Sequence, residues 1–574
     1  MGKIRCYTWV LLIAVSGVFT FCATAAVPAD TAAELWQLYG VYPYGPMSRQ
    51  IPGLNPNAGP IEVILAQGEL ESVCLAVDNR KSKDTFDFRV LSYFPDFPKD
   101  KLRVGRLVYL LSRNKPHPGH IDGSHEVADA IVPVSATEPV TVAAGESRHL
   151  WLTVDARGVP AGQYSGRVTV RPMTVRQDMP NHETKKIQIN IRVLPFALPD
   201  KTPLNVFSWE YGSSTNNDEW LANFIEHRQN VFHLRMDIHS RKSHVKLNPD
   251  GTLAEKPDFS ELTERLLRGK PYGKFFFETD FGNRDSDKKS GRWECTDGST
   301  IPYLSDRWAI GYKQWLGEFK AYMESLGIGT DQWYIVTHDE AFFQDAKKGS
   351  LGCAKLTYQV DPTIQYFMNS WPGGPEQLKP WRSTNTTWCP DYGTYNQASW
   401  HWIKAEKTPT WMYFCHHQTR HLSPHAFYRG RGWLAWIFKL DGVAFFSPGA
   451  HMGSQWDDLD GKLGDPCLLL EGAYNQPVNT RRWEAYREGI EDYMYLHLLD
   501  NLLKTKEPDA ALATKARKLM ADACLEFELA TDHAYLDGEQ KRGWIVTGDN
   551  AKTTEAQRKQ IAKLIIKLRG SGKN

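Results

Sequence analysis

The first third of the chain alternates apolar and polar residues in short runs, which is the pattern of β-strands with one buried face. Between residues 35 and 199, these runs are rich in Val, Leu, Ile and Tyr, and turn signals such as Val159-Pro160-Ala161-Gly162 separate them. Several short strands joined by regular turns are typical of a β-sandwich. The runs span residues 61–77, 102–111, 147–156, 163–172 and 185–199.

After prolines at positions 195, 199 and 203, strands begin to alternate with helix-like segments. Eight strands that alternate with helices over about 250 residues match a (β/α)8 barrel, and an open doubly wound sheet is the structural alternative. The barrel interpretation places its active site at the C-terminal ends of the strands. We predict these strands at residues 204–210, 231–236, 274–279, 332–340, 364–370, 386–391, 411–416 and 442–447.

Helices are predicted between these strands, for example at residues 219–229 and 306–327, and again throughout the last part of the chain. The helix at 306–327 carries aromatic residues every three or four positions, which marks one buried face. These residues are Trp308, Tyr312, Trp315, Phe319 and Tyr322. After Thr480, helices are predicted at 481–504, 510–529 and 554–568.

The patterns together predict an α/β and all-β chain in four parts. These are a signal peptide at 1–26, a β-sandwich domain at 30–200, a (β/α)8 TIM-type catalytic barrel at 201–480 and a C-terminal helical region at 481–574.

The first residues have the pattern of a secretory signal: Lys3 and Arg5, an apolar run over residues 9–21, and small residues at 23–26. We therefore expect export to the periplasm or the extracellular space. The apolar run is shorter than the ~20 residues of a membrane span, and no later segment has the pattern of one. Phe21 disfavours lipoprotein anchoring at Cys22, because lipoprotein signals place a small residue before the cysteine.

Charge and cysteine content narrow the function classes. With 68 basic and 67 acidic residues, the net charge of +1 gives no argument for a nucleic-acid partner or an anionic membrane. Of nine cysteines, Cys6 and Cys22 fall in the leader, and the other seven form no CxxC pair. A zinc ribbon or a dense disulfide scaffold is therefore disfavoured, while one or two disulfides and buried free thiols both remain open. The 20 Trp suit a large core and equally the stacking of rings on sugars.

An acidic pair ends the fourth predicted barrel strand, in the segment WYIVTHDE at residues 333–340. Strand alternation directs Asp339 and Glu340 to different sides, but at a strand end both can reach one ligand. Adjacent carboxylates repel, which favours keeping a proton on one of them, as a general acid requires. The pair is therefore our candidate for glycoside hydrolysis.

Three further segments resemble glycoside hydrolase family 123, whose known members are β-N-acetylgalactosaminidases. They are RGRGWLAWIFKLDGVAFFSPG at 429–449, QWDDLDGKLGDPCLLLEG at 455–472 and RRWEAYREGIEDYMYL at 481–496, in that order. The similarity also includes AGQYSGRVTV at 161–170 and the acidic pair, so that it extends over most of the chain after the leader.

This resemblance implies a retaining, substrate-assisted mechanism that needs no cofactor and no enzyme nucleophile. The 2-acetamido oxygen of the sugar attacks the anomeric carbon. Asp339 would orient and polarise the acetamido N–H. Glu340 would protonate the leaving oxygen and then activate water. The implied partner is a glycan that carries a terminal β-linked N-acetylgalactosamine.

Polar and aromatic residues at the other strand ends are candidates for shaping the sugar pocket, and of these we favour Tyr392 and Tyr413 as donors to the acetamido oxygen. In an alternative glycosidase of another specificity, with two separated carboxylates, the second would be Glu210, Glu278 or Asp391. A non-catalytic carbohydrate-binding protein of the cell surface is the alternative from another class. The pocket candidates are Trp209, Glu210, Asn369, Trp371, Trp388, Asp391, Tyr392, Tyr413 and Trp456, the last followed by Asp457.

Two charged groups receive structural interpretations. The histidines at 416, 417, 421 and 425 lack an HExxH pattern, so we predict no metal site there. Arg487, Glu488, Glu491 and Asp492 are interpreted as structural ion pairs within a helix.

Overall fold

The computed structural model describes one compact unit that begins at Trp36. The described residues are 36–112, 126–173, 184–236, 245–282, 293–341, 344–370, 374–391, 397–414, 420, 423–451, 453–460, 467–505, 509–535 and 550–570. The predicted signal at 1–26, with Cys22, lies outside them. Among the described residues, no helix is long and apolar enough to cross a membrane.

Two five-stranded sheets form the predicted sandwich. One has the order β1 (Gln37–Val41), β3 (Leu70–Asp78), β8 (Ser147–Asp155), β5 (Leu102–Leu111) and β6 (Glu126–Pro133). The other has the order β2 (Ile61–Gln67), β10 (Lys185–Ala197), β9 (Gly162–Pro172), β4 (Phe86–Tyr93) and β7 (Val140–Val142).

The run at 61–77, which we had treated as one apolar segment, is two strands that belong to different sheets. Strand β2 pairs with β10, whereas β3 pairs with β1 and β8. The chain turns between them at Gly68, whose φ of +77° lies in the left-handed region that glycine adopts at little cost. Composition alone did not distinguish the two, because Val, Leu and Ala occur in both strands.

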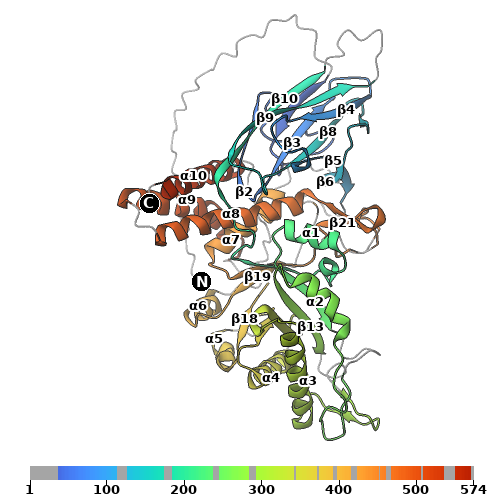
Figure 1. Ribbon diagram of the computed structural model, residues 1–574, viewed down its shortest axis with the longest axis vertical. Helices are drawn as coiled ribbons and strands as arrows, with labels where there is room; N and C mark the ends of the chain where they lie inside the picture. The colour runs from blue at the N-terminus through green and yellow to red at the C-terminus, as the bar shows by residue number, and fades with distance from the viewer. Residues whose placement is uncertain are drawn as a thin grey trace, which may run out of the picture. The chain divides into compact units, whose positions relative to one another are not determined.

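Eight parallel strands form the barrel, and all eight predicted segments contribute one strand each (Figure 1). Isolated parallel bridges, Trp388 to Thr410 and Asp391 to Tyr413, join the first strand of this order to the last and so close the sheet. The open-sheet alternative is therefore wrong. The order is β18 (Thr386–Trp388), β17 (Gln365–Met368), β16 (Trp333–His338), β13 (Lys274–Gly282), β12 (Val231–Met236), β11 (Asn205–Ser208), β20 (Gly442–Phe445) and β19 (Trp411–Phe414).

Helices follow most of the barrel strands, and three long helices end the chain. In α3, the predicted aromatic face is confirmed, since Trp308, Tyr312, Trp315 and Phe319 are fully buried and Tyr322 is half-buried. Two small hairpins, β14 (Trp293–Glu294) with β15 (Thr300–Ile301) and β21 (Leu469–Glu471) with β22 (Pro477–Asn479), lie in loops. The helices are α1 (Asp218–Glu226), α2 (Thr263–Gly269), α3 (Asp306–Ser325), α4 (Gln344–Val360), α5 (Pro375–Leu378), α6 (Gln397–Ala405), α7 (Gly430–Ile437), α8 (Arg481–Thr505), α9 (Ala510–Tyr535) and α10 (Asn550–Gly570).

The cysteines whose side chains the structure describes are buried and form no disulfide bond with one another. They are Cys74, Cys295, Cys353, Cys389 and Cys467. Cys415 and Cys524 lie outside the described side chains.

Helix α8 is buried on every side over its first sixteen residues, 481–496. It packs against strands β3 and β6 of the sandwich and against helices α7 and α10 (Figure 1). The crossing with α7 is so close that a Cβ atom at either Gly432 or Gly489 would collide with the backbone of the opposite segment. Glycine at both positions is what allows this approach.

The buried part of α8 carries charged side chains, and each is paired with a group from another part of the chain or with its own neighbour. Arg482 meets Asp129 of β6 at 2.8 Å between Nη2 and Oδ2. Asp492 accepts from Nε of Arg429 at 2.7 Å. Arg487 pairs with Glu491. The predicted structural ion pairs are thus confirmed, and they extend beyond the helix to connect the sandwich with the barrel.

Removing one member of such a pair is expected to leave a buried charge without compensation. We expect Arg482→Met to lower the free energy of unfolding by about 3–5 kcal/mol, because Asp129 then stays buried alone. Adding Asp129→Leu should recover most of that loss. Urea denaturation followed by tryptophan fluorescence measures both. Lys518→Met, which breaks an exposed pair with Asp522, is the control and should change little. An Arg482→Met protein as stable as the control variant would contradict this account.

Candidate active site

The barrel interior is filled by alternate residues of the parallel strands, and polar side chains follow at their C-terminal ends. Phe367, Cys389 and Trp411 belong to one buried interior cluster. Asn369, Asp391 and Tyr413 follow two positions later on the same three strands or directly after them. Since a period of two keeps side chains on one face, the polar group lies at the mouth of the barrel, where barrel enzymes carry their active sites. The interior cluster comprises Phe207, Trp209, Val231, Phe276, Tyr334, Val336, Phe367, Cys389, Trp411, Tyr413 and Ala444.

Strand β16 ends at His338, and the acidic pair forms the turn that follows it. Glu340 has a φ of +44°, in the left-handed region that a residue with a Cβ atom rarely adopts. This conformation costs roughly 1 kcal/mol or more. The surrounding contacts must therefore hold it, and the backbone N–H of Glu340 indeed donates to Oδ1 of Asn369 at 2.8 Å.

Asn369 joins the two acidic residues. Its Nδ2 donates to Oδ1 of Asp339 at 2.6 Å, while its Oδ1 accepts from the Glu340 backbone. The amide side chain of Asn369, which follows β17, thus holds both the carboxylate of Asp339 and the backbone of Glu340 in place. The exposed fraction of Glu340 is 4%, so its carboxyl group is directed into the protein.

Tyr413 reaches Glu340 from β19. Its hydroxyl donates to Oε1 of Glu340 at 2.5 Å. The ring of Trp209 lies 5.1 Å from the Tyr413 ring, and the Tyr413 backbone N–H donates to the Pro390 carbonyl at 3.1 Å. Trp209 therefore supports the tyrosine, and the hydroxyl that we expected to meet an acetamido oxygen is bonded to the second carboxylate.

A second polar pair, His233 and Glu278, lies on the neighbouring strands β12 and β13. Nε2 of His233, in β12, lies 3.0 Å from Oε2 of Glu278, in β13. Nδ1 of His233 accepts the backbone N–H of Tyr211 at 3.1 Å, so in this arrangement the ring proton is on Nε2, the nitrogen nearer Glu278. Burial would raise the pKa of Glu278, but its interactions with His233 and Arg235 together outweigh burial and hold the pKa below its usual range.

Glu210 is directed at the backbone that follows it. It accepts from the Ser214 backbone at 2.7 Å and from the His233 backbone at 2.9 Å, and the Ser214 hydroxyl also donates to it. Burial raises the pKa of Glu210 above its usual value. These bonds give Glu210 the role of a brace between strands β11 and β12.

Other predicted pocket residues lie elsewhere. Trp388 is fully buried outside the interior cluster, with its ring 5.2 Å from that of Trp381. Nε1 of Trp456 donates to the Glu471 carbonyl at 2.8 Å, and its ring packs beside a small cluster that includes Leu110 of the sandwich. Asp457 is exposed. Trp371 and Tyr392 lie outside the described residues.

His338, to which the sequence assigned no role, is buried between β16 and α4. Its Nε2 lies 2.9 Å from the Tyr303 hydroxyl and its Nδ1 lies 2.9 Å from Oγ1 of Thr337. Burial lowers the pKa of His338 to about 3, so the ring is neutral near pH 7. Its side chain braces the strand whose end carries the acidic pair.

We predict no metal site at the histidines 416, 417, 421 and 425. The structure describes one of them, His425, whose Nδ1 lies 2.7 Å from the hydroxyl of Tyr42. His416, His417 and His421 lie outside the described residues. Within the described residues, no three or more His, Cys, Asp or Glu side chains are grouped so that they could hold a metal ion.

His233 is the member of this site that sequence reasoning missed. The only signal was a histidine within the apolar run VFHLRM at 231–236, which is equally expected for a packed core residue.

No protein-family model matches this chain, and no curated protein does either. Among solved structures, a family 123 glycoside hydrolase from Clostridium perfringens matches 93% of this chain and 99% of its own, with a TM-score of 0.66 and 12% sequence identity. A family 30 subfamily 8 xylanase from Clostridium acetobutylicum matches 44% of this chain and 65% of its own at 11% identity, with a TM-score of 0.29. A β-D-glucuronidase from Dictyoglomus thermophilum matches 73% of this chain and 90% of its own at 9% identity, with a TM-score of 0.30.

The last two similarities are too weak to support any conclusion about the fold. The first extends over the sandwich, the barrel and the C-terminal helices alike. This chain therefore has the fold of a family 123 glycoside hydrolase.

Proposed function

We propose that the protein is an exported glycoside hydrolase that removes terminal β-linked N-acetylgalactosamine by a retaining, substrate-assisted mechanism. One observation carries the proposal. Asn369 fixes Asp339 and Glu340 together at the mouth of the barrel, in a chain with the family 123 fold. The Clostridium protein was studied for the hydrolysis of glycolipid glycans, so a glycoconjugate is the substrate class we favour. The leader pattern at 1–26 supports export.

In the first step, the acetamido oxygen attacks the anomeric carbon while the bond to the leaving oxygen breaks. Asp339 accepts a hydrogen bond from the acetamido N–H, which increases the negative charge on the attacking oxygen. The bond from Asn369 holds the Asp339 carboxylate in one orientation for this task. Such orientation supports catalysis because the attacking group must be held close to its target.

Glu340 supplies the proton that the leaving oxygen takes up. In the second step it accepts a proton from water, whose oxygen attacks the anomeric carbon and restores the acetamido group. The hydrogen bond from Tyr413 fixes one oxygen of the Glu340 carboxyl group, so proton transfer runs through a group of defined orientation.

A second candidate function has one specific observation in its favour. Because His233 and Arg235 together hold the pKa of Glu278 below its usual range, this carboxylate is ionised near neutral pH, as an enzyme nucleophile must be. A glycosidase with two separated carboxylates, Glu340 as acid and Glu278 as nucleophile, would not need the acetamido group of the substrate.

Paired aryl glycosides distinguish these functions. We expect wild type to release nitrophenol from the β-N-acetylgalactosaminide and not from the β-galactoside, because only the first carries the nucleophile. Glu340→Gln and Asp339→Asn should each lower kcat/KM by about 10²–10⁴-fold, the range for general acid–base groups.

Glu264→Gln, on an exposed carboxylate of α2, is the matched control and should retain full activity. Hydrolysis of both substrates, lost in Glu278→Gln and retained in Asp339→Asn, would replace the substrate-assisted mechanism by the second candidate. Absence of hydrolysis of any aryl glycoside would contradict both.

Asn369→Ala is expected to lower kcat about 10²-fold while the protein stays folded, because loss of the clamp lets Asp339 and Glu340 shift from their working positions. Steady-state kinetics with the same aryl N-acetylgalactosaminide measures this, and circular dichroism checks the fold. Asn385→Ala serves as control. Asn385 precedes β18, at the end of the parallel strands opposite the acidic pair, and donates there to the Thr363 carbonyl. Equal kcat in both variants would show that the clamp is unnecessary.

A further inference from the structure

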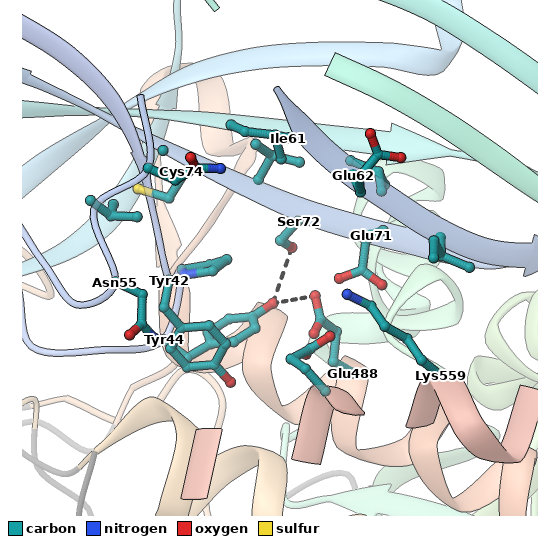
Figure 2. Close-up of a pocket in the computed structure, with 18 of the residues that line it drawn as sticks. Tyr42, Tyr44, Asn55, Ile61, Glu62, Glu71, Ser72, Cys74, Glu488 and Lys559 are labelled. Atoms are coloured by element: carbon teal, nitrogen blue, oxygen red, sulfur yellow. Dashed lines mark hydrogen bonds between the residues drawn. The ribbon is translucent and has the colours of Figure 1, made fainter. Parts of the chain in front are cut away.

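A cavity of about 430 Å³ lies between the sandwich and the C-terminal helices (Figure 2). Its walls come from the segment after β1, from strands β2 and β3, and from helices α8 and α10. None of the residues of the candidate active site lines it. Its volume is within the range of about 300–1,000 Å³ that small-molecule sites occupy.

One side of this cavity is aromatic and apolar. Tyr42 and Tyr44 contribute rings in an edge-to-face arrangement, 5.8 Å apart, and Val73 and Cys74 are buried beside them. The hydroxyl groups of both tyrosines are engaged: Tyr42 meets His425 at 2.7 Å, and Tyr44 donates to Glu488 at 2.5 Å and lies 3.0 Å from Oγ of Ser72. The polar ends of both tyrosines are thus bonded to protein groups, and their rings line the cavity.

The opposite side is acidic. Glu71 of β3, Glu488 of α8 and Glu555 of α10 line the cavity from three different elements, and Figure 2 shows Glu71 and Glu488 directed at the same space. Three arginines pair with these groups. Arg429 meets Glu488 at 3.2 Å and Glu555 at 2.5 Å, Arg558 meets Glu71 at 3.0 Å, and Arg487 meets Glu488 at 3.5 Å.

All three arginines are also shared with other carboxylates, Arg487 with Glu491. Arg429 bonds to Asp492 and Arg558 to Glu69. Oε2 of Glu488 is buried and accepts no hydrogen bond from the described residues, with Nη1 of Arg429 3.2 Å away. Burial raises the pKa of Glu488 to about 7 and that of Glu71 well above its usual value. These buried carboxyl groups therefore take up a proton more readily than exposed ones, and each shares its arginine with another carboxylate, so a cation in the cavity would favour their ionised forms.

Lys559 is the basic residue among those that line the cavity. It is exposed at the edge of the cavity, and in Figure 2 its ammonium group points toward Glu71. No ion pair within 4.0 Å fixes it among the described residues, so a ligand with the same charge could take its place.

We propose that this cavity is a second ligand site, which binds a small organic ammonium compound. The ammonium group lies against Glu71, Glu488 and Glu555, and the apolar body packs on the rings of Tyr42 and Tyr44. Aromatic faces and carboxylates together are the surroundings that organic cations prefer. The volume is far larger than a single metal ion needs, which favours an organic body. The proposal does not depend on the glycosidase activity.

Isothermal titration calorimetry of the whole protein with cyclohexylamine and cyclohexanol tests it, because the two probes match in shape and differ in charge. We expect wild type to bind the amine at least about tenfold more tightly than the alcohol at pH 7.5. Ala556→Trp, on the exposed side of α10 at the cavity wall, should abolish amine binding by filling the space. Lys559→Met should tighten it a few-fold by removing the competing cation.

Gln560→Trp, also exposed on α10 and outside the lining, is the matched control and should bind the amine like wild type. The double variant Asp339→Asn, Glu340→Gln should also bind it normally, which separates this site from the candidate active site. Equal binding of amine and alcohol, amine binding that survives Ala556→Trp, or weaker binding in Lys559→Met would each overturn the proposal. Competition by Ca²⁺ alone, lost in Glu555→Gln, would replace the organic cation by a metal.

Discussion

The burial of charge on helix α8 is the constraint on which the rest of this structure depends. Taking a carboxylate or guanidinium out of water costs several kcal/mol unless a partner and further hydrogen bonds compensate. Arg482 finds its partner in the sandwich and Asp492 finds its partner beside the barrel. Neither the sandwich nor the barrel alone supplies partners for all the buried charges of α8. The sandwich, the barrel wall and the C-terminal helices must therefore pack together.

The same requirement explains why the hydrophobic core does not divide at the end of the sandwich. One cluster of buried residues runs from Tyr39 in β1 to Leu568 in α10 and passes through the outer face of the barrel. Tyr44 adds a polar connection from the sandwich to Glu488 of α8. The proposed ammonium site lies at this junction, where carboxyl groups that serve the packing also line a cavity.

At the mouth of the barrel, the acidic pair is held by contacts that come from other strands. Glu340 adopts a left-handed backbone conformation that its own sequence disfavours. Asn369 from β17 and Tyr413 from β19 provide the hydrogen bonds that hold it. Strain retained at a strand end is typical of functional sites, because only a surrounding structure can impose it. The site therefore depends on barrel closure as much as on the two carboxylates themselves.

Sequence periodicity was sufficient for the eight strands and for the buried face of α3, whereas the choice between a closed barrel and an open sheet needed the structure. Most of the eight strands combine a short apolar run with a following helix, and each of these signals is local. Periodicity was insufficient at residues 61–77, where one glycine divides two strands of different sheets. The local pattern indicates which residues are buried, but it does not indicate which of the two sheets a strand joins.

For the candidate site too, the sequence determined some features and the tertiary structure decided others. The sequence determined that Asp339 and Glu340 lie at a strand end, since the apolar run before them marks the strand. It also selected Asn369 and Tyr413, but as sugar contacts and without their bonds to the pair. Only the tertiary structure decided that Trp388 faces away from the interior, that Trp209 supports Tyr413 and that His233 meets Glu278. These outcomes depend on which strands become neighbours and how the barrel closes, and such long-range geometry leaves no local trace in the amino-acid pattern.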